Sequence, residues 1–283
     1  MPELPEVETV RRALEATVVG RTIRTARISG LALHGHVPRT LPRALRGRRI
    51  RAIGRHGKFL LVALDGDRTL LSHLGMSGRW LFFPEAGDPH LAHVHLGITF
   101  EDGTHLWFQD PRRFGMLRIV RDAALARDPS LALLGPDPVA TPPTGATLRA
   151  AAAGSRTAVK TLLLDQRRIA GLGNIYASEV LHRAGVDPRR AARTLTLPEW
   201  TRVAAETVQV LDEAIARSGT TFSMYRTVWG ESGGYGDRLR VYDRAGEPCR
   251  RCGTPIRRIV QGQRSTYFCP TCQGRRGPAR PRS

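Results

Sequence analysis

Residues 249–272 read CRRCGTPIRRIVQGQRSTYFCPTC and contain all four cysteines of the 283-residue chain. The cysteines form two Cys-x-x-Cys pairs, Cys249 with Cys252 and Cys269 with Cys272. Two such pairs facing each other across a β-hairpin supply four thiolates in a tetrahedron, which is the closed ligand set of one structural zinc ion. Disulfides are the alternative, and the spacing together with an intracellular setting disfavours them.

The segment between the two pairs predicts a hairpin. Ile256–Val260 and Ser265–Phe268 are expected as strands, joined at Gln261-Gly262-Gln263. Arg264 lies beside this turn, where a rigid hairpin could insert it into a groove or an active site. A simple phosphate contact is the other interpretation of Arg264.

The opposite end of the chain begins MPELPE. Removal of Met1 exposes Pro2 as a secondary amine, and an α-amino group titrates near pH 8, so a useful fraction is nucleophilic at neutral pH. Attack of this amine on a sugar or carbonyl carbon gives an iminium ion, and Glu3 and Glu6 are placed to move the protons. An ordinary amphipathic helix with Pro5 in its first turn explains the same residues.

The charge of the chain favours a polyanionic partner. The net charge is +19, and of the 44 lysine and arginine residues only Lys58 and Lys160 are lysines. Nucleic acid is therefore the leading partner. The two lysines suggest sites that need an ammonium group, with chance retention as the alternative. No apolar run reaches transmembrane length and the acidic N-terminus is unlike a signal peptide, so we expect a soluble intracellular protein.

The pattern along the chain predicts an α+β fold. Short strands with turn signals over residues 21–120 indicate an antiparallel β-sandwich behind the first helix, and residues 148–218 have helical periodicity with a capping box at Thr196–Glu199. The expected segments are a helix and β-sandwich (1–120), a linker (121–147), a helical domain that ends in a glycine-rich loop (148–243), a four-cysteine finger (244–273) and a disordered basic tail (274–283).

Three loops carry further candidate residues. GLGN at 171–174 precedes a predicted helix, and glycines before an Asn174 N-cap expose backbone N–H groups for a phosphate that Lys160 could also reach. In DPRRFG, at 110–115, Arg112 and Phe114 share a tight turn that could enter a duplex. Met76, within HLGMSG at 73–78, could act as a second apolar wedge. Core packing is the alternative for Met76 and Phe114.

Taken together, these segments resemble bacterial formamidopyrimidine-DNA glycosylases from Pro2 to Cys272. The motifs that carry the resemblance are PELPEVE, HGKFL, SHLGMSG, QDPRRFG, GLGNIYASE and the four-cysteine finger, in this order. The resemblance implies a β-sandwich, a helix–two-turn–helix domain and a zinc finger. It also implies removal of oxidised purines, such as 8-oxoguanine and formamidopyrimidines, followed by strand cleavage through β,δ-elimination.

The resemblance also implies roles for individual residues. Pro2 is the nucleophile at C1′ of the damaged nucleotide, Glu3 is the acid/base that opens the sugar, and Glu6 supports Glu3. Lys58 donates a proton in β-elimination and Arg264 acts in δ-elimination. The residues that fill the gap left by the flipped base or bind DNA are Met76, Arg112, Phe114, Lys160, Asn174 and, aligned less securely, His93 and Arg156.

Two other classes stay open at this stage. An endonuclease VIII-type glycosylase for oxidised pyrimidines shares Pro2, Glu3 and the finger, but that subgroup usually has glycine at the position of Leu4 and lacks the arrangement of Arg112 and Phe114. A non-catalytic zinc-finger protein that binds damaged DNA would be expected to have lost Pro2 or Glu3. We expect a monomer that acts on damaged duplex DNA in a bacterial cytoplasm, in association with the nucleoid, with zinc and no small-molecule cofactor.

Overall fold

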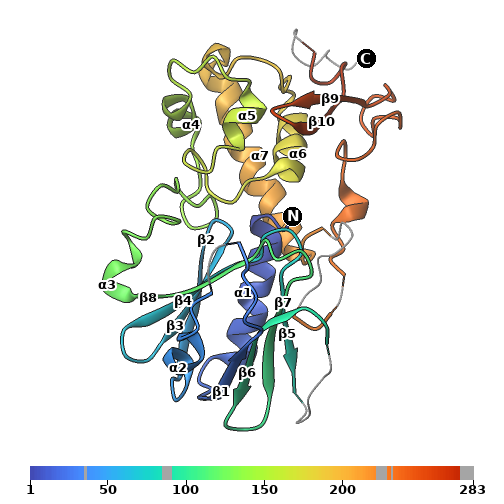
Figure 1. Ribbon diagram of the computed structural model, residues 1–283. Coiled ribbons are helices and arrows are strands. Elements are labelled where there is room, and N and C mark those ends of the chain that lie inside the picture. Colours follow the sequence, from blue (N-terminus) through green and yellow to red (C-terminus); the bar gives the residue numbers. More distant parts are fainter. Residues whose placement is uncertain (35–36, 85–90, 221–227, 231, 275–283) are drawn as a thin grey trace. The chain divides into compact units, whose positions relative to one another are not determined.

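The computed structural model describes the chain except for residues 35–36, 85–90, 221–227, 231 and 275–283 (Figure 1). It forms two compact units, the first comprising Met1–Ala132 and Ile215–Gly236 and the second Leu133–Ala214 and Asp237–Ser283. Helices and antiparallel sheets are both present, which confirms the predicted α+β class. The expected basic tail lies, apart from Gly274, outside the described residues.

Two four-stranded antiparallel sheets form most of the first unit. The order in one sheet is β1-β6-β7-β5, and the strands are β1 (Ile23–Ile28), β6 (Val94–Phe100), β7 (His105–Gln109) and β5 (Arg79–Phe83). The order in the other is β2-β3-β4-β8, with β2 (Ile50–His56), β3 (Phe59–Leu64), β4 (Arg68–His73) and β8 (Met116–Arg121). Apolar side chains from both sheets share one buried core, so the unit is a β-sandwich.

Helix α1 (Leu4–Val18) positions the N-terminus on this sandwich. Its apolar residues at helical spacing, including Val7, Val10 and Leu14, are part of the core that both sheets share. The polar side of α1 is also fixed, because buried Glu8 accepts a hydrogen bond from Arg55 of β2 at 2.9 Å. The first residues of the chain are therefore held by an anchored helix.

The second unit is helical apart from a C-terminal hairpin. Its helices are α4 (Gly145–Ala151), α5 (Val159–Leu163), α6 (Asn174–Ala184), the 3-10 helix η1 (Ala192–Thr194) and α7 (Leu197–Ala216), which runs into the first unit. The predicted capping box is present, because the Thr196 N–H donates to Glu199 at 2.8 Å and the Glu199 N–H donates to the Thr196 hydroxyl at 3.4 Å. Among the described residues, no helix is long and apolar enough to cross a membrane.

The predicted hairpin consists of β9 (Arg257–Gln261) and β10 (Arg264–Phe268), which pair in antiparallel register. Gly262 and Gln263 have φ angles of 52° and 61°, so both residues adopt the left-handed region that a two-residue turn with the right-handed strand twist requires. The 3-10 helix η2 (Gly236–Arg238) precedes the segment that leads to the finger.

The sequence missed some elements. Strand β5 was not predicted because its apolar run, Trp80–Phe83, is short and is followed at once by Pro84. Two short helices were not predicted either. Helix α2 (Leu41–Leu45) interrupts the region expected to form strands, and α3 (Asp122–Leu125) follows it. The segment Ile215–Gly236, expected to belong with the helical domain, clusters with the first unit, where the Phe82 N–H donates to the Val228 carbonyl at 3.1 Å.

Candidate functional site

The N-terminus is held by the residues that the sequence selects for chemistry. Pro2 is buried, and Glu3 and Glu6, both almost fully buried, form a capping box at the start of α1. Glu6 Oε2 accepts the Glu3 N–H at 2.8 Å, and Glu6 Oε1 accepts the Thr220 N–H at 2.7 Å. Glu6 thus links Glu3, the residue next to Pro2, to Thr220, which follows α7.

The electrostatics of the terminal amine show which side chains surround it. Burial is the largest influence and lowers the pKa of the amine of Met1, while the charges of Glu3 and Glu6 raise it and those of Lys58 and Arg112 lower it. Lys58, in the tight turn between β2 and β3, is itself buried. Two carboxylates and two cations from separate segments therefore converge on one amine.

Two loops of the first unit present apolar side chains to solvent. Met76 is 41% exposed and Phe114 is 44% exposed, and the guanidinium of Arg112 lies 5.0 Å from the centre of the Phe114 ring. The exposure of Met76 and Phe114 rules out the alternative of core packing for both. His93, exposed on the neighbouring segment, accepts the Asp110 N–H through its carbonyl at 3.0 Å.

A buried carboxylate fixes both loops. Asp110, with 0% of its surface exposed, accepts the Ser77 hydroxyl through Oδ1 and the Gly115 N–H through Oδ2, the latter at 2.7 Å. The Arg112 N–H donates to the same Ser77 oxygen at 3.1 Å. At Gly75 the backbones are so close that an added Cβ would lie 2.3 Å from the carbonyl of Phe114. The loop that carries Met76 and the loop that carries Phe114 are therefore held together by these contacts.

His73, the last residue of β4, stabilises the same pair of loops. Its Nδ1 accepts the Gly75 N–H at 3.0 Å, and its ring packs on Phe59 with centroids 4.7 Å apart. Burial, followed by the charge of Lys58, lowers the pKa of His73 from 6.5 to about 4, so the imidazole is neutral at physiological pH. The sequence reasoning assigned no role to His73 or to Asp110, although both lie inside motifs that it quoted.

In the second unit, Lys160 and Asn174 meet the start of β10. Lys160 is 1% exposed, and its Nζ donates to Asn174 Oδ1 at 2.6 Å, to the Ser265 carbonyl at 2.8 Å and to Thr266 Oγ1 at 2.8 Å. Asn174 Nδ2 donates to the Ser265 carbonyl at 3.0 Å. The structure thus gives both side chains contacts that fasten the helices to the hairpin, next to exposed Arg264.

Two details of the phosphate-binding expectation are wrong. Gly173 is the N-cap of α6 and Asn174 is its first residue, because the Asn174 side chain turns to the hairpin. The Gly171 N–H, expected to be available, donates to Gln166 Oε1 at 2.8 Å. Arg156 is exposed ahead of α5, on a different segment from this cluster.

The four cysteines converge as predicted. The Sγ atoms of Cys249, Cys252, Cys269 and Cys272 all lie within 4.8 Å of one another, and all four cysteines are free, which removes the disulfide alternative. Burial, followed by hydrogen bonds with its cysteine neighbours, raises the pKa of Cys272, so a group of thiolates this close needs a cation. The cluster is the site of one structural zinc ion, since four sulfur ligands leave no open position.

Two further buried residues support the finger, and no sequence motif identifies either of them. His182 Nε2 lies 3.5 Å from Cys249 Sγ, as expected of a side chain that orients a metal ligand. Glu179, fully buried, accepts the backbone N–H groups of Arg240, Val241 and Tyr242 at 2.8–2.9 Å. A carboxylate on the buried side of a predicted helix was the only available hint for Glu179.

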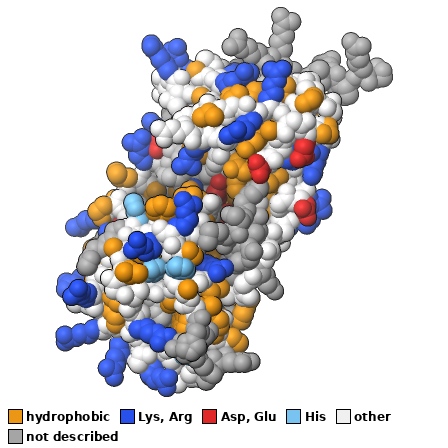
Figure 2. Space-filling view, turned by 45° about the vertical axis from the view of Figure 1, so that its right-hand side comes forward, with side chains coloured by type: hydrophobic (Ala, Val, Ile, Leu, Met, Phe, Trp, Pro, Cys, Tyr) orange, Lys and Arg blue, Asp and Glu red, His pale blue; other side chains and the backbone are white. Residues whose placement is uncertain are grey.

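The surface agrees with the charge of the sequence. Figure 2 shows arginine and lysine side chains spread over the visible face, with fewer acidic ones. A polyanion can therefore approach without a large opposing acidic patch on this face.

Comparison with known proteins identifies this arrangement. Three family models match consecutive parts of the chain: the formamidopyrimidine-DNA glycosylase N-terminal domain (residues 1–117), its H2TH domain (134–226) and the zinc finger found in FPG and IleRS (246–274). Together with the β-sandwich, the helical unit and the four-cysteine cluster, these matches define a zinc-finger DNA glycosylase.

Relatives match over nearly the whole chain. The formamidopyrimidine-DNA glycosylase of Methylococcus capsulatus is 44% identical and that of Paracoccus denitrificans 45% identical, each over 96% of this chain and 100% of the relative. The crystal structure of the MutM (FPG) protein of Thermus thermophilus is 42% identical with a TM-score of 0.86, covering 96% of this chain and 99% of that one. Lactococcus lactis Fpg in complex with DNA containing an abasic site is 32% identical with a TM-score of 0.87, covering 96% and 100%. The chain belongs to the formamidopyrimidine-DNA glycosylase family.

Proposed function

We propose that this protein excises oxidised purines, 8-oxoguanine and formamidopyrimidines, from duplex DNA and then cleaves the strand at the same site. The observation that carries the proposal is the convergence of Glu3, Glu6, Lys58 and Arg112 on the terminal amine. The protein is accordingly a bifunctional DNA glycosylase and lyase of base-excision repair. Related structures hold DNA that contains a formamidopyrimidine or an abasic site.

The chemistry begins at Pro2. With Met1 removed, the nitrogen of Pro2 becomes the terminal amine, and because an α-amino group titrates near pH 8, a useful fraction is unprotonated and nucleophilic at neutral pH. This nitrogen bonds to C1′ as the C1′–base bond breaks and the base leaves with the electron pair. Glu3 protonates the ring oxygen O4′, the sugar opens, and an iminium ion joins Pro2 to C1′.

Strand cleavage uses the iminium ion as an electron sink. Loss of a proton from C2′ breaks the C3′–oxygen bond, and a second elimination breaks the C5′–oxygen bond. Lys58 supplies a proton in the first elimination and Arg264 assists the second. Glu6, through its bonds to the N–H groups of Glu3 and Thr220, holds Glu3 in position.

Access to C1′ requires the damaged nucleotide to leave the base stack, which costs a few kcal/mol. Met76, Phe114 and Arg112 fill the gap, since exposed apolar side chains next to a cation suit insertion between bases. Asn174 and Lys160 contribute to DNA binding by holding the hairpin that presents Arg264, since the three N–H groups of Lys160 are donated within the protein. His93 and Arg156 are exposed and contribute through direct contacts.

The domain roles follow the same scheme. Residues 1–120 form the catalytic part, 121–147 the linker, 148–243 the helix–two-turn–helix part with its substrate loop, and 244–273 the finger. Of the expected substrate loop, at 220–242, residues 221–227 and 231 lie outside the described residues. The relatives are bacterial proteins, and we place this one in the bacterial cytoplasm at the nucleoid, as a monomer.

Oxidised pyrimidines are a second candidate substrate class. A structure of Lactococcus lactis Fpg, 33% identical to this chain, holds DNA that contains an oxidised pyrimidine. The relative rates on the two classes of lesion therefore decide between the two types of glycosylase.

Borohydride trapping tests the proposal on duplexes with 8-oxoguanine opposite cytosine and with thymine glycol. We expect a covalent adduct at residue 2, formed faster with 8-oxoguanine. A variant with an additional residue that blocks removal of Met1 should bind DNA without trapping, while Glu15→Gln, an exposed change on the same helix, should trap normally. Faster trapping on thymine glycol would assign the protein to the pyrimidine class, and tight binding without an adduct would leave a damage-binding protein.

A further inference from the structure

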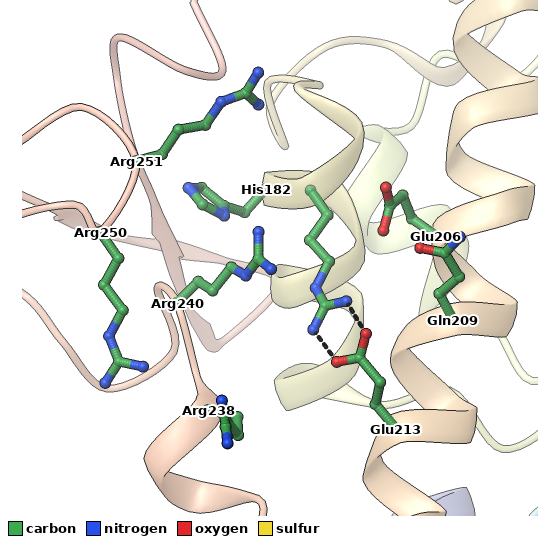
Figure 3. A pocket seen from close by; sticks show the side chains of 9 residues that line it. His182, Glu206, Gln209, Glu213, Arg238, Arg240, Arg250 and Arg251 are labelled. Atoms are coloured by element: carbon green, nitrogen blue, oxygen red, sulfur yellow. Dashed lines mark hydrogen bonds and ion pairs between the residues drawn. The ribbon is translucent and has the colours of Figure 1, made fainter.

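A large cavity of the second unit has no part in the proposed reaction. Its volume is about 790 Å³, and it is lined by the end of α6, by α7, by η2 and the residues after it, and by the two residues between Cys249 and Cys252 (Figure 3). Five of its nine lining residues are arginines. It lies at the end of α6 opposite to Asn174, about 15 Å along the helix at 1.5 Å per residue. The cavity is therefore separate from the cluster that holds the hairpin.

The arginines of the cavity outnumber its carboxylates. Arg183 is neutralised by a bidentate ion pair with Glu213 at 2.7 and 2.6 Å. The other four arginines share the lining with one further carboxylate, that of Glu206, and among the described residues none of the four forms an ion pair. Four thiolates around a zinc ion carry two negative charges, which offset part of this excess. The remaining positive charge lies in a cavity, where it attracts an anion more strongly than on an open surface.

The four unpaired arginines are spread along one side of the cavity. Figure 3 shows their guanidinium groups apart from one another, with Arg251 at the top of the view, Arg240 below it and Arg238 at the bottom, across from Glu206 on α7. One small anion cannot contact guanidinium groups that are separated in this way. An anion with a charge repeated along its length can contact several of them, and the guanidinium fork suits phosphate oxygens. The arrangement therefore fits a ligand with successive phosphates.

The opposite side of the cavity offers polar groups of another kind. Glu206 and Gln209 of α7 line it, and Glu206 Oε2 is buried without a partner among the described residues. A carboxylate on this side repels a ligand that is anionic along its whole surface, such as polyphosphate. It accepts an N–H, and the Watson–Crick edge of every nucleobase carries one. A ligand with phosphates on one side and bases on the other therefore matches both sides of the cavity.

The same arrangement selects one strand of DNA rather than two. In a duplex the Watson–Crick edges are paired with each other, so they cannot reach Glu206 while the phosphates contact the arginines. In a single strand the bases are free to turn to one side and the phosphates to the other. The segment that carries the arginines is also fixed in place, because the Arg240 N–H donates to buried Glu179 at 2.8 Å and Arg250 donates to the Asp237 carbonyl at 2.7 Å. This reduces the entropy lost on binding.

We propose that this cavity binds single-stranded DNA through internal phosphates, which contact Arg238, Arg240 and Arg251, while Glu206 accepts an N–H from a base. The contacts are made to the backbone and to an N–H that all bases share, so binding is largely independent of sequence. The site is separate from the residues assigned to excision, and it holds a second DNA segment while the duplex with the lesion is bound.

Fluorescence anisotropy of the full-length, zinc-loaded protein tests the proposal. The protein is first saturated with an unlabelled duplex that contains an uncleavable abasic-site analogue, and a labelled single strand without a lesion is then titrated. We expect the strand to bind to this complex. The triple variant Arg238→Gln, Arg240→Gln, Arg251→Gln should bind it at least tenfold more weakly, with unchanged zinc content and unchanged affinity for the duplex. The slope of log affinity against log salt concentration should fall by about 2, since each phosphate contact to a single strand contributes about 0.7.

A second triple variant controls for net charge. Arg24→Gln, Arg43→Gln, Arg46→Gln removes the same charge from exposed positions of the first unit, and it should bind the strand as the native protein does. Three results overturn the proposal: no binding of the strand by the saturated native protein, an equal loss of affinity in the two triple variants, or tighter binding of polyphosphate or of a glutamate-rich peptide than of a strand with the same charge. The affinity for the duplex, measured separately, keeps a failure of this proposal distinct from a failure of the proposed excision.

Discussion

Replacement of Asp110 should loosen the two loops that carry Met76 and Phe114. In Asp110→Ala the buried Ser77 hydroxyl and the buried Gly115 N–H both lose their acceptor. Each buried donor without a partner costs about 1–3 kcal/mol, so we expect a loss of about 2–6 kcal/mol in the free energy of unfolding. Asp110→Asn keeps the shape but turns one of the two acceptor oxygens into an NH2 donor. The Asn oxygen can still accept the Gly115 N–H, while the Ser77 hydroxyl loses its acceptor, for about 1–3 kcal/mol.

The measurement is urea denaturation of both variants, together with two activity assays. The loops act on a stacked duplex, so excision of 8-oxoguanine from a duplex should fall tenfold or more, where tenfold corresponds to about 1.4 kcal/mol. Cleavage at an abasic site in single-stranded DNA, which needs no base flipping, should stay close to native in Asp110→Asn. A denaturation midpoint of Asp110→Ala equal to the native one, or equal losses in both activities of Asp110→Asn, would refute the reasoning.

Three further predictions concern the N-terminus, the pH response and the metal. Glu6→Gln, which turns one acceptor into a donor facing the N–H of Glu3 or Thr220, should lower single-turnover trapping about tenfold at unchanged DNA affinity in a binding assay; a matched loss of affinity would contradict a positioning role. The pKa of His73 falls from 6.5 to about 4 on folding, so the unfolded chain takes up the proton first as the pH drops. The contribution of His73 to the free energy of unfolding should therefore be complete above pH 6.5 and decline toward pH 4, by up to about 1.4 kcal/mol per pH unit. Urea melts of His73→Gln should show a smaller decline over this range, and a pH profile identical to that of the native protein would exclude the effect. A thiol reagent should release one zinc ion per chain in a colorimetric assay and abolish DNA binding; retained binding by the metal-free protein would show that the finger is dispensable.

Local patterns were enough to predict much of the fold. The apolar run at β3, the hairpin at β9 and β10 and the capping box of α7 each depend on residues close together in sequence, and the structure shows all three. The cysteine spacing likewise predicted the zinc site. These features form through interactions between residues close together in the chain, so they can be predicted from the sequence alone.

The rest depends on partners that are distant in sequence. Asparagine is a residue type that often caps a helix N-terminus, yet the side chain of Asn174 donates a hydrogen bond to Ser265, 91 residues later. Asp110 pairs with Ser77 across 33 residues, and Glu6 with Thr220 across 214. Nothing in the local pattern specifies these pairs, because they arise when separate elements pack. For the same reason, no local pattern predicts the role of Asp110.

The contacts of Lys160 have a consequence for biosynthesis. Two acceptors of this buried ammonium, Ser265 and Thr266, are translated more than one hundred residues after it. Until the hairpin emerges from the ribosome and takes up zinc, the charge would have to be buried without these two acceptors, which is strongly unfavourable. The helical unit should therefore complete its folding only after translation ends, so that a truncated chain or a zinc-starved cell would yield a protein open to proteolysis in its middle rather than one that lacks only its last residues.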